Sequence, residues 1–68
     1  MESTSRRQLT AVVTALKING LMAEVTVKVA GGEELVPVIT RTAAEHLTLQ
    51  VGDRVTVIIT PTEILLSK

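Results

Sequence analysis

The segment Met22–Ala30 alternates strictly between small apolar and polar residues, and this period of two constrains the fold more than any other feature. The apolar set is Ala23, Val25, Val27 and Val29, and the polar set between them is Glu24, Thr26 and Lys28. Successive side chains of a strand point to opposite faces, so the segment predicts a strand with one buried and one solvated face. Ten Thr and fifteen Val or Ile residues favour the same pleated backbone elsewhere in the chain.

Turn residues divide the chain into five expected strands. These are Leu9–Lys17, Met22–Ala30, Glu33–Thr40, Arg54–Thr60 and Glu63–Ser67. One face of the first strand is expected to carry Leu9, Ala11, Val13 and Ala15. The Asn19-Gly20 pair after it predicts a hairpin turn of type I′, which needs positive φ at both central residues. Pro37 has no N–H for a β ladder, and it therefore predicts an edge or a bulge in the third strand.

The period changes between Arg41 and Leu49, where apolar residues recur at helical spacing. Thr42 and Glu45 fit the spacing of a capping box, in which a hydroxyl and a carboxylate cap the first turn. We therefore expect one short helix between strands three and four. Three strands, a helix and two further strands predict an all-β, five-stranded OB-like barrel, as a single domain over residues 1–68. A mixed open sheet with one helix is the alternative.

Composition excludes several classes of function. Seven basic and seven acidic residues give a net charge of zero, whereas a general nucleic-acid binder needs a basic surplus to displace counterions. The chain has no Phe, Trp or Tyr to stack on bases, and no Cys for disulfides, zinc sites or thiol chemistry. No nucleophile or orienting carboxylate stands at catalytic spacing from the only histidine, His46, so we expect a protein that is not an enzyme.

We expect a soluble, cytoplasmic homo-oligomer without membrane or nucleic-acid partners. Residues 1–7 carry charges but no apolar core of a signal peptide behind them. The longest apolar run is far shorter than the roughly 20 residues that span a bilayer. The chain has 23 Val, Ile and Leu residues in a total of 68, with no disulfide, and domains of this size usually need support beyond their own core.

Two segments concentrate hydrogen-bond donors. Residues 3–8, Ser-Thr-Ser-Arg-Arg-Gln, combine hydroxyls, two guanidinium groups and an amide just before the first strand. The segment Thr40-Arg41-Thr42 lies where a strand runs into a helix N-terminus, whose free N–H groups and positive dipole end favour anions. Both patterns suit a small oxyanion. A polar chain terminus and a simple helix N-cap are the structural alternatives.

These segments fall within a resemblance that covers essentially the whole chain. Thr4-Ser5-Arg6-Arg7-Gln8-Leu9 resembles the Ser-Ala-Arg-Asn-Gln-Leu opening of the molbindins, the small molybdate-binding (Mop) proteins. The further matching segments are Ala23–Val25, Ala30–Gly32, Val38–Thr40, Leu49–Asp53 and Thr62–Leu65. Their order and spacing, together with the total length, make the match specific.

The resemblance implies an OB-like subunit in a hexamer, a trimer of dimers, that stores or buffers molybdate or tungstate at subunit interfaces. The oxyanion-binding residues that it implies are Thr4, Ser5, Arg6, Thr40, Ala43 and Thr60, with Arg7 in place of the family's Asn. Ala43 stands where the family has a Ser and Thr60 where it has a Lys, so a hydroxyl and a positive charge are lost. The oxyanion itself is the only bound group implied, with no side-chain metal ligands. A regulatory, oxyanion-sensing module is the alternative to storage.

Overall fold

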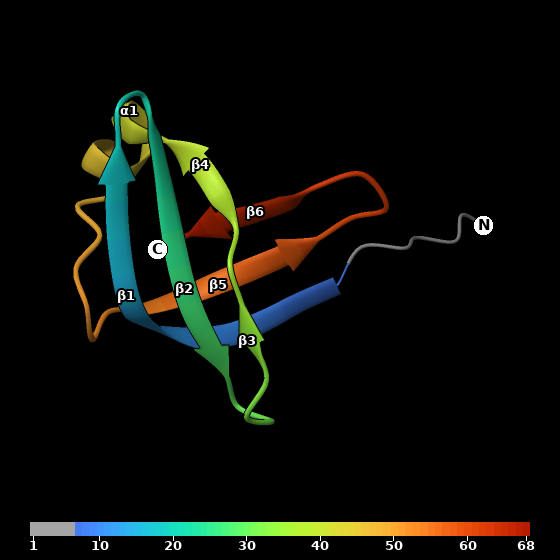
Figure 1. Ribbon diagram of the computed structural model, residues 1–68. Helices are drawn as coiled ribbons and strands as arrows, with labels where there is room; N and C mark the ends of the chain where they lie inside the picture. Colours follow the sequence, from blue (N-terminus) through green and yellow to red (C-terminus); the bar gives the residue numbers. More distant parts are fainter. Residues whose placement is uncertain (1–6) are drawn as a thin grey trace.

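The computed structural model describes residues 7–68, which form one sheet of six antiparallel strands and a single short helix (Figure 1). The elements are β1 (Arg7–Asn19), β2 (Met22–Val29), β3 (Glu34–Leu35), β4 (Val38–Thr40), α1 (Arg41–His46), β5 (Arg54–Ile59) and β6 (Ile64–Ser67). The strand order is β3-β2-β1-β5-β6, and β4 also pairs with β2. The long strand β1 is therefore central, with β2 on one side and β5 on the other.

The expected all-β, OB-like fold with one short helix is confirmed. Strand β1 pairs with β5 from Arg7 to Val12 and with β2 from Ala11 onward, so the sheet rolls around its own core (Figure 1). The alternating small apolar residues of the sequence fill that core. The largest fully buried side chains are Val13, Val25, Val27 and Val57. A core of this kind consists of β-branched residues, which pack well on pleated surfaces.

The expected third strand is divided into two, so the sheet has six strands rather than five. Both β3 and β4 pair with β2, but residues 36–37 between them leave the ladder. Pro37 accounts for the break, because it has no N–H to donate. Its carbonyl still accepts a hydrogen bond from the N–H of Val25 at 3.0 Å. The predicted irregularity of this edge at Pro37 is confirmed.

The predicted inward face of the first strand is wrong beyond Val13. A β-bulge shifts the register of β1 against β2 between Val13 and Ala15. One extra residue reverses the faces of all that follow. Ala15 is consequently exposed, and Leu16 packs against the core in its place. At the bulge, the Thr14 hydroxyl donates to the carbonyl of Thr26 at 3.3 Å.

The first hairpin is confirmed, but its turn is not the predicted type I′. Asn19 still belongs to β1 and pairs with Met22, so the loop consists of Gly20 and Leu21. Gly20 has a φ of +65°, whereas neither Asn19 nor Leu21 is among the described residues with positive φ. Glycine at the first of two loop positions is the arrangement of a type II′ turn. The Asn19-Gly20 pair therefore predicts the two-residue loop one position before its actual place at Gly20 and Leu21.

Helix α1 is shorter than expected and has a different cap. It ends at His46 rather than Leu49, and its N-cap is Thr40. The predicted capping box is wrong, because Thr42 lies inside the helix. Glu45 pairs with Arg41 instead, at 3.2 Å between Oε2 and Nε. No helix in the part of the chain that the structure describes is long and apolar enough to cross a membrane.

The helix ends in a Schellman-type arrangement with an unusual residue at its left-handed position. The N–H of Thr48 donates to the carbonyl of Glu45 at 3.0 Å, and that of Leu49 donates to Ala44 at 3.2 Å. This pattern normally places glycine at the residue after the C-cap. Here the residue is Thr48, with a φ of +52°. A β-branched side chain in this region is strained.

The end of β6 is fastened to the loop that follows α1. The Nζ atom of Lys68 lies 2.7 Å from Oδ2 of Asp53 and donates to the carbonyl of Thr48, also at 2.7 Å. The N–H of Gln50 donates to the same carboxylate at 2.8 Å. The hydrogen bonds from Lys68 and Gln50 hold the pKa of Asp53 below its ordinary value.

Candidate functional site

A groove of about 570 Å³ lies between β4 and β6, each of which pairs with one strand of the sheet. Residues 36–40 form one wall and residues 63–65 the other, and Met22 and Ala43 complete the lining. Within residues 7–68, β4 pairs only with β2, and β6 pairs only with β5. Each of the two walls therefore has a strand edge that no described strand covers. Two of the predicted site residues, Thr40 and Ala43, lie in this groove.

Thr40 and Ala43 are joined by a hydrogen bond. The backbone N–H of Ala43 donates to Oγ1 of Thr40 at 3.1 Å, and this bond caps α1. A threonine hydroxyl can accept such a bond and still donate its own hydrogen. Among residues 7–68 the Thr40 hydroxyl donates to no acceptor. Thr40 therefore presents a donor whose oxygen is held in place by the helix.

The start of α1 offers fewer free backbone donors than the sequence predicts. The N–H of Arg41 donates to the carbonyl of Leu21 at 2.8 Å, and the N–H of Ala43 is used by Thr40. The exposed guanidinium of Arg41 is paired with Glu45. Side chains, rather than the helix N–H groups, must therefore supply most of the donors for an anion in this groove.

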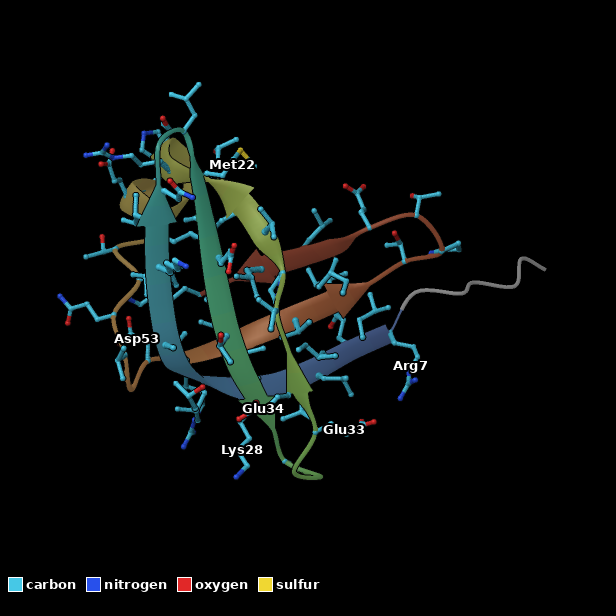
Figure 2. All side chains as sticks on the ribbon, viewed as in Figure 1. Arg7, Met22, Lys28, Glu33, Glu34 and Asp53 are labelled. Carbon is cyan, nitrogen blue, oxygen red and sulfur yellow. The ribbon has the colours of Figure 1, made fainter. Side chains whose placement is uncertain are left out.

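Arg7 is the first residue of β1 and is not part of the groove lining. Its register partner is Ile59, the last residue of β5, so Arg7 stands beside the end of the strand that leads to Thr60. Figure 2 shows Arg7 at the tip of β1, far from Met22 at the start of β2. Arg7 lines a different cavity, of about 410 Å³, that it shares with Glu33.

The hydroxyl of Thr60 is committed to the turn between β5 and β6. Its oxygen accepts from the N–H of Glu63 at 3.1 Å, and its O–H donates to the carbonyl of Glu63 at 3.2 Å. The backbone N–H of Thr60 donates to the same carbonyl at 2.9 Å. Thr60 therefore shapes the turn around Pro61, and its hydroxyl hydrogen is already used.

The remaining predicted site residues, Thr4, Ser5 and Arg6, lie outside the described residues. Of those that are described, Thr40 and Ala43 line the groove, and Thr60 is hydrogen-bonded to Glu63 on the opposite wall of the same groove. Arg7 alone lines a different cavity. Within residues 7–68, no group of three or more His, Cys, Asp or Glu side chains is placed to hold a metal ion. The available chemistry is hydrogen-bond donation by hydroxyls and guanidinium groups.

Sequence reasoning missed the apolar rim of the groove. Val38 and Leu65, on opposite walls, are 53% and 41% exposed, which leaves large apolar side chains uncovered in a single chain. The sequence signal was weak: Leu35–Ile39 has apolar residues on both faces of the strand, although only one face can reach the core of one subunit. Such a pattern is typical of a strand that is covered from both sides.

The family model of the TOBE domain matches residues 3–66. Two curated relatives carry the name molybdenum transport protein ModE. The protein from Herbaspirillum seropedicae is 32% identical over 66 residues, which are 97% of this chain and 24% of that protein. The protein from Azotobacter vinelandii is 30% identical over 67 residues, which are 98% of this chain and 25% of that protein. The chain thus spans about a quarter of the length of these relatives.

Two solved structures are similar in fold over nearly the whole chain. MopII from Clostridium pasteurianum superposes with a TM-score of 0.78 at 29% identity, and the match covers 91% of each chain. The cytoplasmic molybdate-binding protein ModG, solved with molybdate bound, superposes with a TM-score of 0.79 at 27% identity. That match covers 98% of this chain and 48% of the ModG chain.

Proposed function

The chain belongs to the TOBE domain family, and on that premise we propose that it binds molybdate at an interface between two copies of itself. The similarity to ModG, a molybdate-binding protein, supports the choice of ligand. The two ModE proteins, which are named for molybdenum transport, support the same chemistry over nearly the full length of this chain.

The placement of Arg7 and Thr40 at different cavities is the observation that supports binding at an interface between two copies. Thr40 and Ala43 line the groove, and Thr60 is bonded to Glu63 on its other wall, while Arg7 lies at the first residue of β1 and lines a different cavity. Because Arg7 lines a different cavity from Thr40 and Ala43, we infer that a single copy does not surround one anion with all of these residues. A second copy supplies the missing half when residues 4–7 of one subunit approach the groove of the other. The uncovered edges of β4 and β6 and the exposed Val38 and Leu65 favour such a contact.

The donor set suits a tetrahedral dianion. Molybdate presents only acceptors, and its removal from water is costly unless good donors replace the lost hydration. The free hydroxyl hydrogen of Thr40 and the guanidinium groups of Arg6 and Arg7 are such donors. Tungstate has the same charge and nearly the same size, so we propose that it binds as well. Sulfate is smaller and fits donors fixed by strands less closely.

We propose that the protein stores or buffers the oxyanion in the cytoplasm as a hexamer, a trimer of dimers. The match to MopII covers 91% of both chains, so a protein of similar size adopts this fold. ModG is cytoplasmic, which supports the proposed location. No turnover of the anion is part of this function.

An oxyanion-sensing regulatory module is the second candidate. The observation that favours it is the length of the ModE relatives, of which this chain spans only about a quarter. In a module of this kind, binding changes the contacts between domains. In a storage protein, binding fills many equal sites without changing the assembly.

Isothermal titration calorimetry of the full chain with molybdate, tungstate and sulfate tests the proposal. We expect saturable binding of molybdate and tungstate with similar affinity, and weaker binding of sulfate. Absence of binding to both larger anions would overturn the proposal. A change of oligomeric state on saturation, followed by sedimentation, would favour the sensing role over storage.

A further inference from the structure

The outer face of the sheet carries a second cleft, on the side of β1 that does not face the core. The register places Val12 directly opposite Lys28 on β2 and opposite Arg54 on β5. The three side chains therefore form one row across three strands, with the two cations on either side of the valine. Both cations line the same cleft of about 450 Å³. Val12 is 40% exposed.

The two cations are not equivalent. Glu34 on β3 is the register partner of Lys28 on the side away from Val12, so an acidic residue faces Lys28 across the two strands. Figure 2 shows Lys28 and Glu34 at the same end of the sheet. Opposite charges that face each other across two strands attract, and this reduces the charge that Lys28 presents to a ligand.

Neither Lys28 nor Arg54 has a carboxylate within salt-bridge distance among residues 7–68. Arg54 differs from Lys28 in that its register partner, Val12, is apolar. Asp53, its neighbour in sequence, is occupied by Lys68 and by the N–H of Gln50. The cleft therefore presents one guanidinium group without an acidic partner. A planar guanidinium matches a carboxylate, to which it can donate two parallel hydrogen bonds.

The rest of the cleft is mainly apolar. Its lining includes Ala11, Val12, Val29 and Ala30, together with Thr10 and Thr14. The Thr14 hydroxyl is already bonded to the carbonyl of Thr26. An inorganic dianion would leave this apolar surface unused. A monocarboxylate with a short aliphatic chain uses both features.

We propose that the cleft between Lys28 and Arg54 binds a small aliphatic carboxylate, with its carboxylate on Arg54 and its hydrocarbon chain over Val12 and Ala30. This site is separate from the groove of Thr40 and Ala43 and does not depend on oxyanion binding there. The free energy for burial of one methylene group, about 0.8 kcal/mol, corresponds to about a fourfold gain in affinity for each added carbon.

Nuclear magnetic resonance titration of the full chain with butyrate, hexanoate and octanoate tests the proposal. We expect backbone amide shifts to concentrate in residues 10–14, 28–30 and 54, with affinity rising up to about fourfold per methylene until the cleft is filled. Hexanol carries the same chain without the charge, and it should bind more weakly than hexanoate. Shifts centred on the groove between β4 and β6, or equal binding of hexanol and hexanoate, would overturn the proposal.

Two matched variants separate charge from fold. Arg54→Gln should weaken hexanoate binding about tenfold or more, because a charge-assisted pair is lost. Arg41→Gln is the control. Arg41 lies on α1, outside the cleft, and is already paired with Glu45, so its replacement should leave hexanoate binding unchanged. Molybdate binding should persist in Arg54→Gln, so failure of the carboxylate site and failure of the oxyanion site are distinguishable. Equal hexanoate affinity of Arg54→Gln and the unmodified chain would contradict the assignment.

Discussion

The hydroxyl of Thr40 accepts a hydrogen bond from the backbone N–H of Ala43 at 3.1 Å, so two residues of the candidate oxyanion site hold each other in position. The bond satisfies one of the unpaired N–H groups at the start of α1. It also fixes the oxygen of Thr40 while its hydrogen stays free to donate. One side chain therefore supports the helix and serves the proposed site.

Replacement of Thr40 separates these two roles. Thr40→Ala should lower the free energy of unfolding by about 1 kcal/mol, the usual cost of losing an N-cap side chain. It should also weaken molybdate binding. Thr40→Ser keeps a hydroxyl at the same place and should preserve both properties. Chemical denaturation and calorimetry of the two variants provide the measurements. Full molybdate affinity in a folded Thr40→Ala protein would exclude this residue from the site.

Arg6 and Arg7 are expected to supply positive charge to the bound oxyanion. Arg6→Ala should weaken molybdate binding by about 10- to 100-fold, since charge-assisted hydrogen bonds are typically worth about 1.5–3 kcal/mol. Arg7→Ala should also weaken it measurably. Arg54→Ala is the matched control and should bind molybdate as the unmodified chain does. Unchanged affinity in Arg6→Ala would remove the N-terminal segment from the site.

Thr60→Lys should strengthen molybdate binding about tenfold or more by adding a cation near the end of β5. The substitution also removes the hydroxyl that bonds to the N–H and carbonyl of Glu63. We therefore expect a loss of stability of about 1 kcal/mol. Thr60→Ala isolates that loss, because it breaks the same bonds without adding charge. Calorimetry and sedimentation should show tighter binding by Thr60→Lys alone and an intact oligomer in both; weaker binding by Thr60→Lys would refute the placement.

Thr48 has a φ of +52° at the end of α1, where glycine is the usual residue. Thr48→Gly should raise the free energy of unfolding by up to about 1 kcal/mol, because release of the left-handed strain exceeds the entropy that glycine costs. Thr42→Gly, within α1 itself, is the control and should lower the stability. The two variants should differ in melting temperature in opposite directions. A destabilised Thr48→Gly protein would show that the threonine makes a compensating contact.

The bond between Asp53 and Lys68 should make stability depend on pH in acid. The hydrogen bonds from Lys68 and Gln50 hold the pKa of Asp53 below the ordinary value of 3.8. The contribution of ionised Asp53 to stability is therefore present above that value and is lost as the pH falls through the lower, folded-state pKa. Melting temperatures of the unmodified chain and of Lys68→Gln should therefore differ at neutral pH, and the difference should shrink as the pH falls below about 4. A difference that stays constant down to pH 2 would show that Lys68 acts through its bond to Thr48 alone.

Local rules predicted the elements of the fold because each strand has its own period and its own turn. They failed where one extra residue shifts the alternation of inward and outward side chains. The bulge after Val13 turns Ala15 outward, and no residue type in the sequence marks it. The cap of α1 was misplaced because Thr40 and Thr42 are chemically equivalent candidates two positions apart. The N–H of Arg41, the first residue of α1, donates to the carbonyl of Leu21, and sequence spacing does not reveal this contact with the first hairpin.

The candidate site was harder to predict than the fold. The resemblance to molbindins named Thr40 and Ala43, and the structure places them together. It also named Thr60, but the sequence could not indicate that Glu63 would occupy the hydroxyl. The groove itself is formed by two strands far apart in sequence, and its exposed apolar walls become visible only when the sheet order is known.

Native mass spectrometry of the full chain, recorded with and without molybdate, tests the central claim most directly, because it reports assembly and bound mass together. The account predicts a hexamer that gains discrete increments of molybdate mass, and an Arg6→Ala protein that assembles but loses them. A well-folded monomer that binds molybdate would contradict the interface site. An oligomer that gains no molybdate mass would contradict the proposed ligand.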